Sequence, residues 1–329
     1  MNHLRFKILP LLATILFACT NTPPDAQTNT SKKLNTKLVA PTFNKDSAYY
    51  FVEKQVSFGP RVISSKGWEN CAIWLEKTLK RYTPDVTIQE APIKTYDGKS
   101  HKLKNIIASF SAEKNNRIAL FAHWDSRHIA DHDTENREKP ILGANDGGSG
   151  VAVLLEIARQ LSKKIPKIGI DIILFDAEDY GQPEDSSYPI MQDSWCLGSQ
   201  YWSKNPHKPN YYAQYGILLD MVGAKNATFR HEQISSYYAS NILQKVWRKA
   251  HRLGFGNYFV FENAPQIIDD HYYVNLITAI PTIDIIEYDP TTENNFNKHW
   301  HTHNDNMDNI NKETLNAVGQ TLLEILYSE

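Results

Sequence analysis

The sequence predicts a single α/β domain with a larger than average sheet, and three observations support this fold class. After residue 38 the chain alternates between strand-like and helix-like segments, and no repeat or internal linker interrupts it. Of the 329 residues, 41% are hydrophobic and 22% are charged, a globular composition that can bury a sizeable core. The apolar run 170–175 is rich in β-branched residues, as expected of a strand buried on both faces. With a formal net charge of −2, nothing in the composition suggests a nucleic-acid partner.

The first 19 residues resemble a bacterial lipoprotein signal. Arg5 and Lys7 precede an apolar run, residues 8–18, that is too short to span a bilayer. The run ends in Leu-Phe-Ala-Cys, which resembles a lipobox, so Cys19 would become the lipidated first residue of the mature chain. An ordinary cleaved signal with an incidental cysteine is the alternative.

Residues 20–38 are rich in Thr, Asn and Pro and lack apolar periodicity, which predicts a flexible tether. The domain then occupies residues 39–329. We expect a monomeric, lipid-anchored protein of the bacterial cell envelope, either periplasmic or associated with the outer membrane. Its only membrane contact would be the anchor at Cys19.

Helices and strands can be assigned along the domain. Apolar spacing predicts helices over residues 47–57, 65–81, 148–164, 235–253 and 312–327. Apolar or alternating runs predict strands over residues 86–93, 103–110, 117–121, 170–175, 215–220 and 282–286. The polar stretches 124–144 and 180–195 follow strand ends and are longer than simple connections require, so we expect them to build a site.

Two cysteines follow Cys19, so the domain contains at most one disulfide bond. Cys71 lies at helical spacing with Trp68 and Trp74, where a small core residue is common. We expect Cys71 and Cys196 to be unpaired and mostly buried.

Carboxylates and imidazoles gather where the predicted strands and loops end. In open α/β sheets ligands bind at the carboxyl ends of the strands, and bunched carboxylates cost free energy unless a cation or a proton relay uses them. Zinc favours this set of side chains, and a catalytic zinc keeps one coordination position open. A solvated acidic turn is the alternative for residues 176–179 taken alone. The side chains concerned are His123, Asp146, Asp176, Glu178, Asp179, Asp220 and His301.

The ordered motifs HWDS, GANDGGSG, FDAED, LLDMVG and WHT resemble the zinc-dependent aminopeptidase family. In particular they resemble its glutaminyl cyclase branch, the animal-type enzymes that also occur in bacteria. The resemblance covers nearly the whole domain, including FGPR at residues 58–61. It implies a single three-layer α/β/α domain with a central mixed, mostly parallel sheet.

On this resemblance Asp146, Asp179 and His301 correspond to zinc ligands, although Asp179 stands where a glutamate is commoner. Glu178 corresponds to the general acid/base. Asp220 corresponds to the acid that binds a second metal in aminopeptidases and serves the proton network in cyclases.

Three features separate the two branches. Asp269, in the segment IDDH, matches the cyclase pattern, whereas aminopeptidases tend to have a serine there. Phe296 and Trp300 match aromatic positions of the cyclase pocket. Trp195 is expected to form a third wall, although animal cyclases place that tryptophan closer to the acidic pair.

The resemblance implies a glutaminyl-peptide cyclotransferase, which converts the N-terminal glutamine of peptides and proteins to pyroglutamate and releases ammonia. The nucleophile, the α-amine, arrives within the substrate, so one zinc per chain suffices as a Lewis acid. Glu178 would take the amine proton and return it to ammonia. Aromatic walls would exclude water, which would otherwise turn the glutamine into glutamate.

Two alternatives stay open. A two-zinc aminopeptidase of the same fold is possible because His123, the further ligand of its second zinc, is present. We expect His123 instead to orient Asp146 or Asp220. A catalytically inactive binding lipoprotein is the other alternative, and the completeness of the acid and histidine set opposes it.

Overall fold

Six strands form the central sheet of the computed structural model, which describes residues 38–329. The strand order is β1-β2-β4-β3-β5-β8. Strands β4, β3, β5 and β8 are mutually parallel, whereas β2 is antiparallel to both β4 and β1. The expected mixed, mostly parallel sheet is therefore confirmed. The bounds are β1 (Val86–Lys94), β2 (Ser100–Phe110), β3 (Arg117–His123), β4 (Gly169–Phe175), β5 (Tyr215–Asp220) and β8 (Thr282–Ile286).

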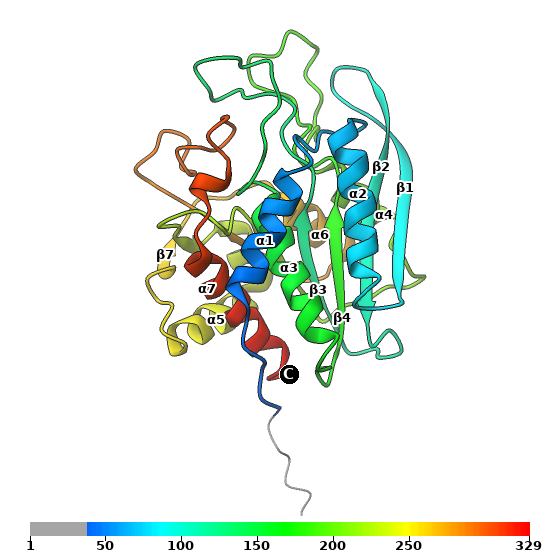
Figure 1. Cartoon of the computed structure of the whole chain (residues 1–329), viewed down its shortest axis with the longest axis vertical. Coiled ribbons are helices and arrows are strands. Elements are labelled where there is room, and N and C mark those ends of the chain that lie inside the picture. The colour runs from blue at the N-terminus through cyan, green and yellow to red at the C-terminus, as the bar shows by residue number, and fades with distance from the viewer. Residues whose placement is uncertain (1–37) are drawn as a thin grey trace, which may run out of the picture. The chain divides into compact units, whose positions relative to one another are not determined.

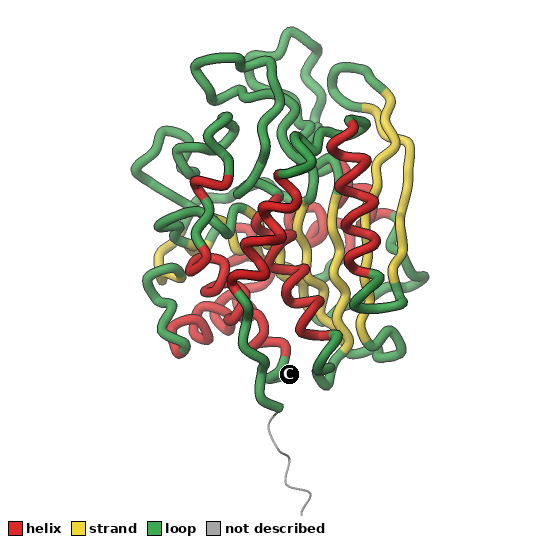
Figure 2. Tube along the Cα trace, viewed as in Figure 1, coloured by secondary structure: helices red, strands yellow, loops and turns green. Residues whose placement is uncertain are grey.

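Helices cover both faces of this sheet, which gives the three layers expected (Figures 1 and 2). Five helices pack with the larger of two buried apolar clusters, on one face. Helices α4 (Leu197–Lys204) and α6 (Asp270–Thr278) contact each other on the opposite face. The five are α1 (Lys45–Val56), α2 (Lys66–Leu79), α3 (Gly148–Leu161), α5 (Gln233–Arg252) and α7 (Lys312–Leu326).

The central strands join the two apolar clusters because successive side chains of a strand point to opposite faces. In β3, Ile118 and Leu120 belong to one cluster, whereas Ala119 and Phe121 belong to the other. Every residue of β3, β4 and β5 is buried. Burial on both faces explains why these strands are continuous apolar runs in the sequence.

All the predicted helices and strands are present, with ends shifted by a few residues. The prediction lacked α4, α6, a 3-10 turn at Met307–Asn309 and a second, two-stranded sheet. That sheet pairs β6 (Phe229–His231) with β7 (Phe259–Asn263). These elements are short, so tertiary contacts rather than a long periodic pattern determine them.

Residues 38–329 form one compact unit. The predicted signal peptide, the lipobox cysteine and nearly all of the tether lie outside the described residues. Among the described helices, none combines the length and hydrophobicity needed to cross a membrane.

The buried side chain of Arg61 holds together the two ends of the long loop 124–144. Its Nε donates a hydrogen bond to the backbone oxygen of Trp124 at 2.8 Å. Its two terminal nitrogens donate to the backbone oxygens of Leu142, at 2.6 Å, and Gly143, at 2.8 Å. Arg61 thereby pairs carbonyl groups that would otherwise be buried without a donor.

Replacing Arg61 by Met should lower the free energy of unfolding by about 3 kcal/mol, because buried carbonyl oxygens lose a charged donor. Urea denaturation followed by circular dichroism would measure this change. Lys66→Met is the matched control, since Lys66 pairs with Glu69 on the exposed surface and its loss should leave the midpoint unchanged. Equal midpoints for the two variants would contradict the role given to Arg61.

Candidate functional site

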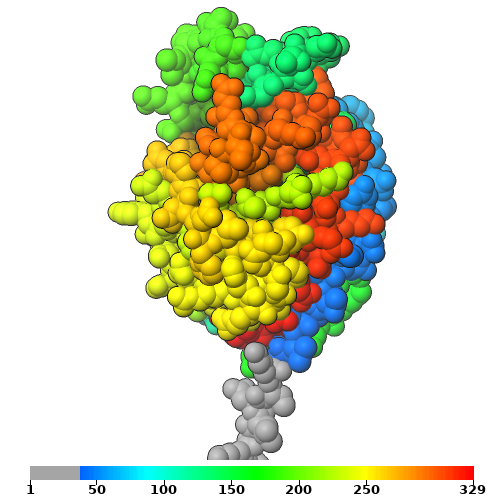
Figure 3. Space-filling model, turned by 90° about the vertical axis from the view of Figure 1, so that its left-hand side faces the viewer, coloured from blue at the N-terminus to red at the C-terminus, as the bar shows by residue number. Residues whose placement is uncertain are grey.

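A cavity of about 850 Å³ lies at the carboxyl ends of the parallel strands. Strand β4 lies on one side of β3 and β5 on the other, so the strand order reverses at β3, where open α/β sheets form a crevice. The loops 124–144 and 180–195 rise side by side above this edge, in two shades of green in Figure 3. An ion pair of 3.1 Å between Arg137 and Asp185 joins them. As expected, one of these loops, 180–195, helps to line the cavity.

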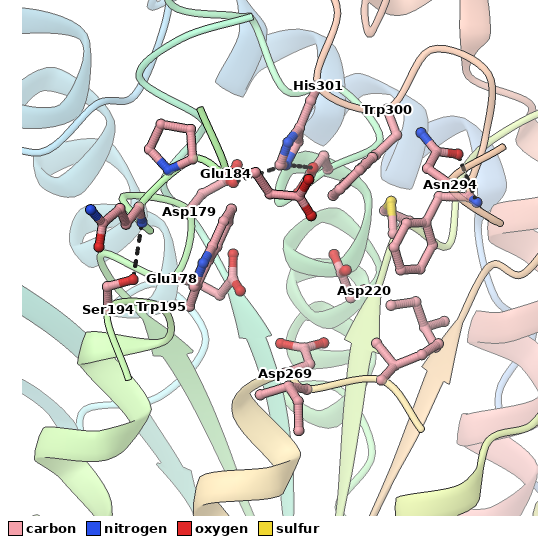
Figure 4. Close-up of a pocket in the computed structure, with 18 of the residues that line it drawn as sticks. Glu178, Asp179, Glu184, Ser194, Trp195, Asp220, Asp269, Asn294, Trp300 and His301 are labelled. Atoms are coloured by element: carbon pink, nitrogen blue, oxygen red, sulfur yellow. Dashed lines mark hydrogen bonds and ion pairs between the residues drawn. The ribbon is translucent and has the colours of Figure 1, made fainter. Parts of the chain in front are cut away.

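Asp146, Asp179 and His301 all line the cavity. Figure 4 shows Asp179 and His301 near each other there. The Nε2 atom of His301 lies 3.2 Å from Oδ1 of Asp179 and 3.6 Å from Oδ2 of Asp146. All three side chains are buried, and one ligand atom from each lies within 4.8 Å of the others. Asp146 lies just before α3, Asp179 lies in the turn after β4, and His301 lies in the segment that follows β8.

These three residues fit a divalent cation. Oδ2 of Asp179 is buried without a hydrogen-bond partner, although a buried carboxylate ordinarily finds one. Burial and the charge of Asp179 raise the pKa of Asp146 to about 6. A cation among them would remove this repulsion, and two carboxylates with one imidazole suit zinc.

Two buried carboxylates fix the backbone behind this group. Asp125 accepts hydrogen bonds from the backbone N–H groups of Glu178 and Asp179, each at 3.1 Å. Asp305 accepts one from the N–H of Asp146 at 3.0 Å and another from the preceding residue at 2.8 Å. Each metal-facing loop is therefore held by a pair of bonds to one carboxylate.

A third carboxylate, Asp131, orients the imidazole of His301, whose Nδ1 lies 3.1 Å from its Oδ1. Arg127 donates to both oxygens of Asp131, at 3.2 and 2.6 Å. Although burial opposes it, the adjacent His301 and Arg127 side chains hold the pKa of Asp131 below its ordinary value. Arg127 also donates to the backbone oxygen of Asp179 at 2.9 Å. It therefore contacts Asp179 directly and His301 through Asp131.

These three positioning acids were not predicted as site residues from the sequence. Asp125 and Asp305 stand two and four residues after a candidate histidine, a spacing that could have indicated them. Asp131 lies inside the irregular loop 124–144, where no local pattern marks it.

Gly147 lets the start of α3 approach this group closely. Its φ of 77° suits glycine, and a Cβ there would lie 2.5 Å from the backbone oxygen of Asp125. The helix has no side-chain cap at this end. Asp146, the residue before Gly147, is thereby placed beside His123.

Glu178 is largely buried at the cavity, next to Asp179. Its Oε2 lies 3.9 Å from Nδ1 of His123, and its Oε1 accepts a hydrogen bond from the thiol of Cys196 at 3.3 Å. Burial raises the pKa of Glu178 well above its ordinary value. The charges of Asp179 and Asp269 add to this shift, and His123 opposes it. A carboxyl group with a raised pKa is a better proton acceptor than an ordinary one, as a general acid/base requires.

His123 lies between two acids, with Nε2 at 3.0 Å from Oδ1 of Asp146 and 3.1 Å from Oδ1 of Asp220. The contacts needed to orient Asp146 or Asp220, as we predicted, are therefore present. The same three side chains also form a group that could hold a metal. The geometry thus accommodates either role for His123.

Asp220 and Asp269 enter the cavity opposite His301 (Figure 4). Burial and the charge of Asp220 raise the pKa of Asp269 to about 6. The side chain of Asp269 caps α6, where it accepts a hydrogen bond from the N–H of Asp270. The position of Asp269 is therefore fixed by the start of a helix that the sequence did not reveal.

The three predicted aromatic residues all line the cavity. The ring of Trp300 stacks on His301 at 3.7 Å between centroids and contacts Phe296 at 4.8 Å. The ring of Trp195 lies parallel to His301 at 5.9 Å. Gly181 leaves room for the ring of Trp195, since a Cβ at that position would lie 1.8 Å from it.

Not every candidate belongs to the site. Asp176 does not line the cavity and accepts hydrogen bonds from Nε1 of Trp68, at 2.9 Å, and the N–H of Lys104, at 2.7 Å. Its role is structural, so the acidic cluster at the end of β4 contributes two acids rather than three. Cys71 and Cys196 are free and buried, as expected.

Comparison with known proteins agrees with this geometry. Residues 105–326 match peptidase family M28. The crystal structure of Tannerella forsythia glutaminyl cyclase is 53% identical, with a TM-score of 0.86, and the match covers 88% of this chain and 100% of that one. A Zn-dependent exopeptidase from Parabacteroides distasonis is also 53% identical, with a TM-score of 0.87 and the same coverage.

A curated relative is more distant. The glutaminyl-peptide cyclotransferase of Gloydius blomhoffii is 26% identical over 246 residues, which are 66% of this chain and 63% of that protein. The match therefore spans less than two thirds of that relative's length. Since the family match extends over residues 105–326, more than half of the chain, the protein belongs to peptidase family M28.

Proposed function

We propose that the protein is a glutaminyl-peptide cyclotransferase, which converts an N-terminal glutamine to pyroglutamate with release of ammonia. The observation that carries this proposal is that three carboxyl groups line the same aromatic-walled cavity as Asp146, Asp179 and His301. Two of them, Asp220 and Asp269, are buried, and the third is that of Glu178. Similarity to the Tannerella forsythia cyclase, over the whole of that chain, supports it.

The cavity suits a substrate that carries a free amine. Its lining in the described part of the chain contains several carboxyl groups and no lysine or arginine. A positively charged or neutral amine is therefore favoured there over an anionic group. A cavity of about 850 Å³ can also admit the first residues of a peptide.

Each group has a distinct part in the proposed reaction. A zinc ion held by Asp146, Asp179 and His301 would supply Lewis-acid polarisation of the side-chain amide. Glu178 accepts the proton of the α-amine as the amine attacks the amide carbon, and returns it to the departing ammonia. Burial and the charge of Asp220 raise the pKa of Asp269, so Asp269 can hold a proton beside the reacting groups.

The aromatic residues orient the substrate and exclude water. Ring closure is already intramolecular, so the gain comes from holding the amine against the amide carbon. Trp195, Phe296 and Trp300 line the cavity, and against a bound substrate these apolar walls would keep out water, which would otherwise hydrolyse the amide to glutamate.

A two-zinc aminopeptidase is the second candidate, and one observation favours it. His123, Asp146 and Asp220 form a further group that could hold a metal beside the first. We propose one zinc per chain and give His123 the role of orienting the two acids.

The two candidates make different products. With a glutamine-led peptide we expect ammonia release and a product lighter by one ammonia, because only this substrate presents a side-chain amide to its own amine. With a leucine-led peptide of the same remaining sequence we expect no free leucine. Coupled ammonia detection and mass spectrometry would measure both, and release of leucine would favour the aminopeptidase.

Glu178→Gln provides the control for that experiment. The variant keeps the shape of the side chain but cannot accept the amine proton, so turnover should fall by about 10² to 10⁴-fold. Its zinc content should equal that of the wild type. Unchanged turnover would remove Glu178 from the proposed mechanism.

The metal content tests the proposed stoichiometry. Purified protein should hold one zinc per chain by elemental analysis, since Asp146, Asp179 and His301 complete a three-residue ligand set. A chelator should abolish activity, and one equivalent of zinc should restore it. Full activity that requires two equivalents would support the aminopeptidase instead.

We further propose that the protein is a monomer of the bacterial cell envelope, anchored through a lipid on Cys19, where it acts on the N-termini of exported proteins. The lipobox-like sequence before Cys19 supports the anchor. Cys19→Ser should move the protein from the membrane fraction to the soluble fraction. Equal partition of the two forms would exclude a lipid anchor at this residue.

A further inference from the structure

The carboxyl group of Glu178 has few partners to orient it. Among the described residues, the thiol of Cys196 is the only donor within hydrogen-bond distance, at 3.3 Å from Oε1. His123 is 3.9 Å from Oε2, which is beyond a hydrogen bond. The nearby charges of Asp179 and Asp269 repel the carboxylate rather than hold it.

Cys196 makes two hydrogen bonds to Glu178, one through its side chain and one through its backbone. Besides the thiol contact, its backbone N–H donates to the backbone oxygen of Glu178 at 3.0 Å. The next residue, Leu197, donates to the backbone oxygen of Ala177 at 3.0 Å. These bonds dock the start of α4 against the turn that carries the acidic pair.

The backbone of Cys196 is held in an unusual conformation. Its φ of 56° is in the left-handed region, which residues with a side chain adopt rarely and mostly where the surrounding structure requires it. The side chain is fully buried and lies outside the cavity lining. Burial and the charge of Glu178 raise the pKa of this thiol, so it stays a donor at neutral pH.

We propose that Cys196 is a positioning residue for the general acid/base. Its thiol donates to Oε1 of Glu178 and fixes the carboxyl group so that Oε2 receives the proton of the substrate amine. This inference rests on the proposed function, since it assigns Cys196 a part in the same proton transfer. The competing explanation is that Cys196 is only a small packing residue.

Paired substitutions separate these explanations. Cys196→Ala removes the donor and should lower kcat about tenfold, as expected for the loss of one hydrogen bond to a charged group, with little change in KM. Cys196→Ser keeps a donor and should restore kcat to within roughly threefold of the wild type. Cys71→Ala, which removes a buried thiol of α2, is the matched control and should keep the wild-type kcat.

A double-mutant cycle with Glu178→Gln tests the coupling directly. If Cys196 acts through Glu178, Cys196→Ala should cause no further loss in the Glu178→Gln background. A packing role should cost the same factor in both backgrounds. Zinc content is measured for every variant so that metal loss is recognised.

Three results would overturn the inference. They are a wild-type kcat for Cys196→Ala, equal losses for the Ala and Ser variants at full zinc content, and an undiminished loss in the Glu178→Gln background. Failure of the proposed function is a separate outcome, because the wild-type protein would then release no ammonia from glutamine-led peptides.

Discussion

The crowding of buried carboxyl groups at one sheet edge is the constraint on which the rest of the site depends. Asp146, Glu178, Asp179, Asp220 and Asp269 all face one cavity, where their mutual repulsion is poorly screened. Shared protons and a bound cation are the physical means of relieving it. The raised pKa values of Asp146, Glu178 and Asp269 show that the chain alone does not neutralise this charge.

The protein holds these groups in place largely through its own backbone. Asp125 and Asp305 each accept two consecutive N–H groups, so the loops that carry the acids cannot rotate freely. Asp131, which is paired with Arg127, contacts the imidazole of His301 through its side chain and so limits the rotation of that ring. These contacts hold the metal-facing side chains in place although they lie in loops rather than in strands. Little rearrangement of these side chains would then be needed when a metal binds.

The sequence was informative where a pattern is local and weak where a contact is distant. Long apolar strands and amphipathic helices were predicted with small errors, because burial on one or both faces leaves a periodic signature. The candidate acids and histidines stood out because they lie at strand or loop ends, and the resemblance to the zinc-dependent aminopeptidase family indicated which of them are ligands. Asp131 was not, since its contact with His301 joins an irregular loop to the far end of the chain. Helix α6, which Asp269 caps, was also missed because it is short and defined by its packing.

The separation of the site residues along the chain has a consequence for how the protein folds. The hydrogen bond between Asp146 and Asp305 joins residues 159 positions apart, and His301 follows β8, which is the last strand of the central sheet along the chain. Closing so long a loop costs entropy that only late tertiary contacts repay. A nascent or partly folded chain therefore lacks the assembled ligand set. High metal affinity would arise only at the end of folding.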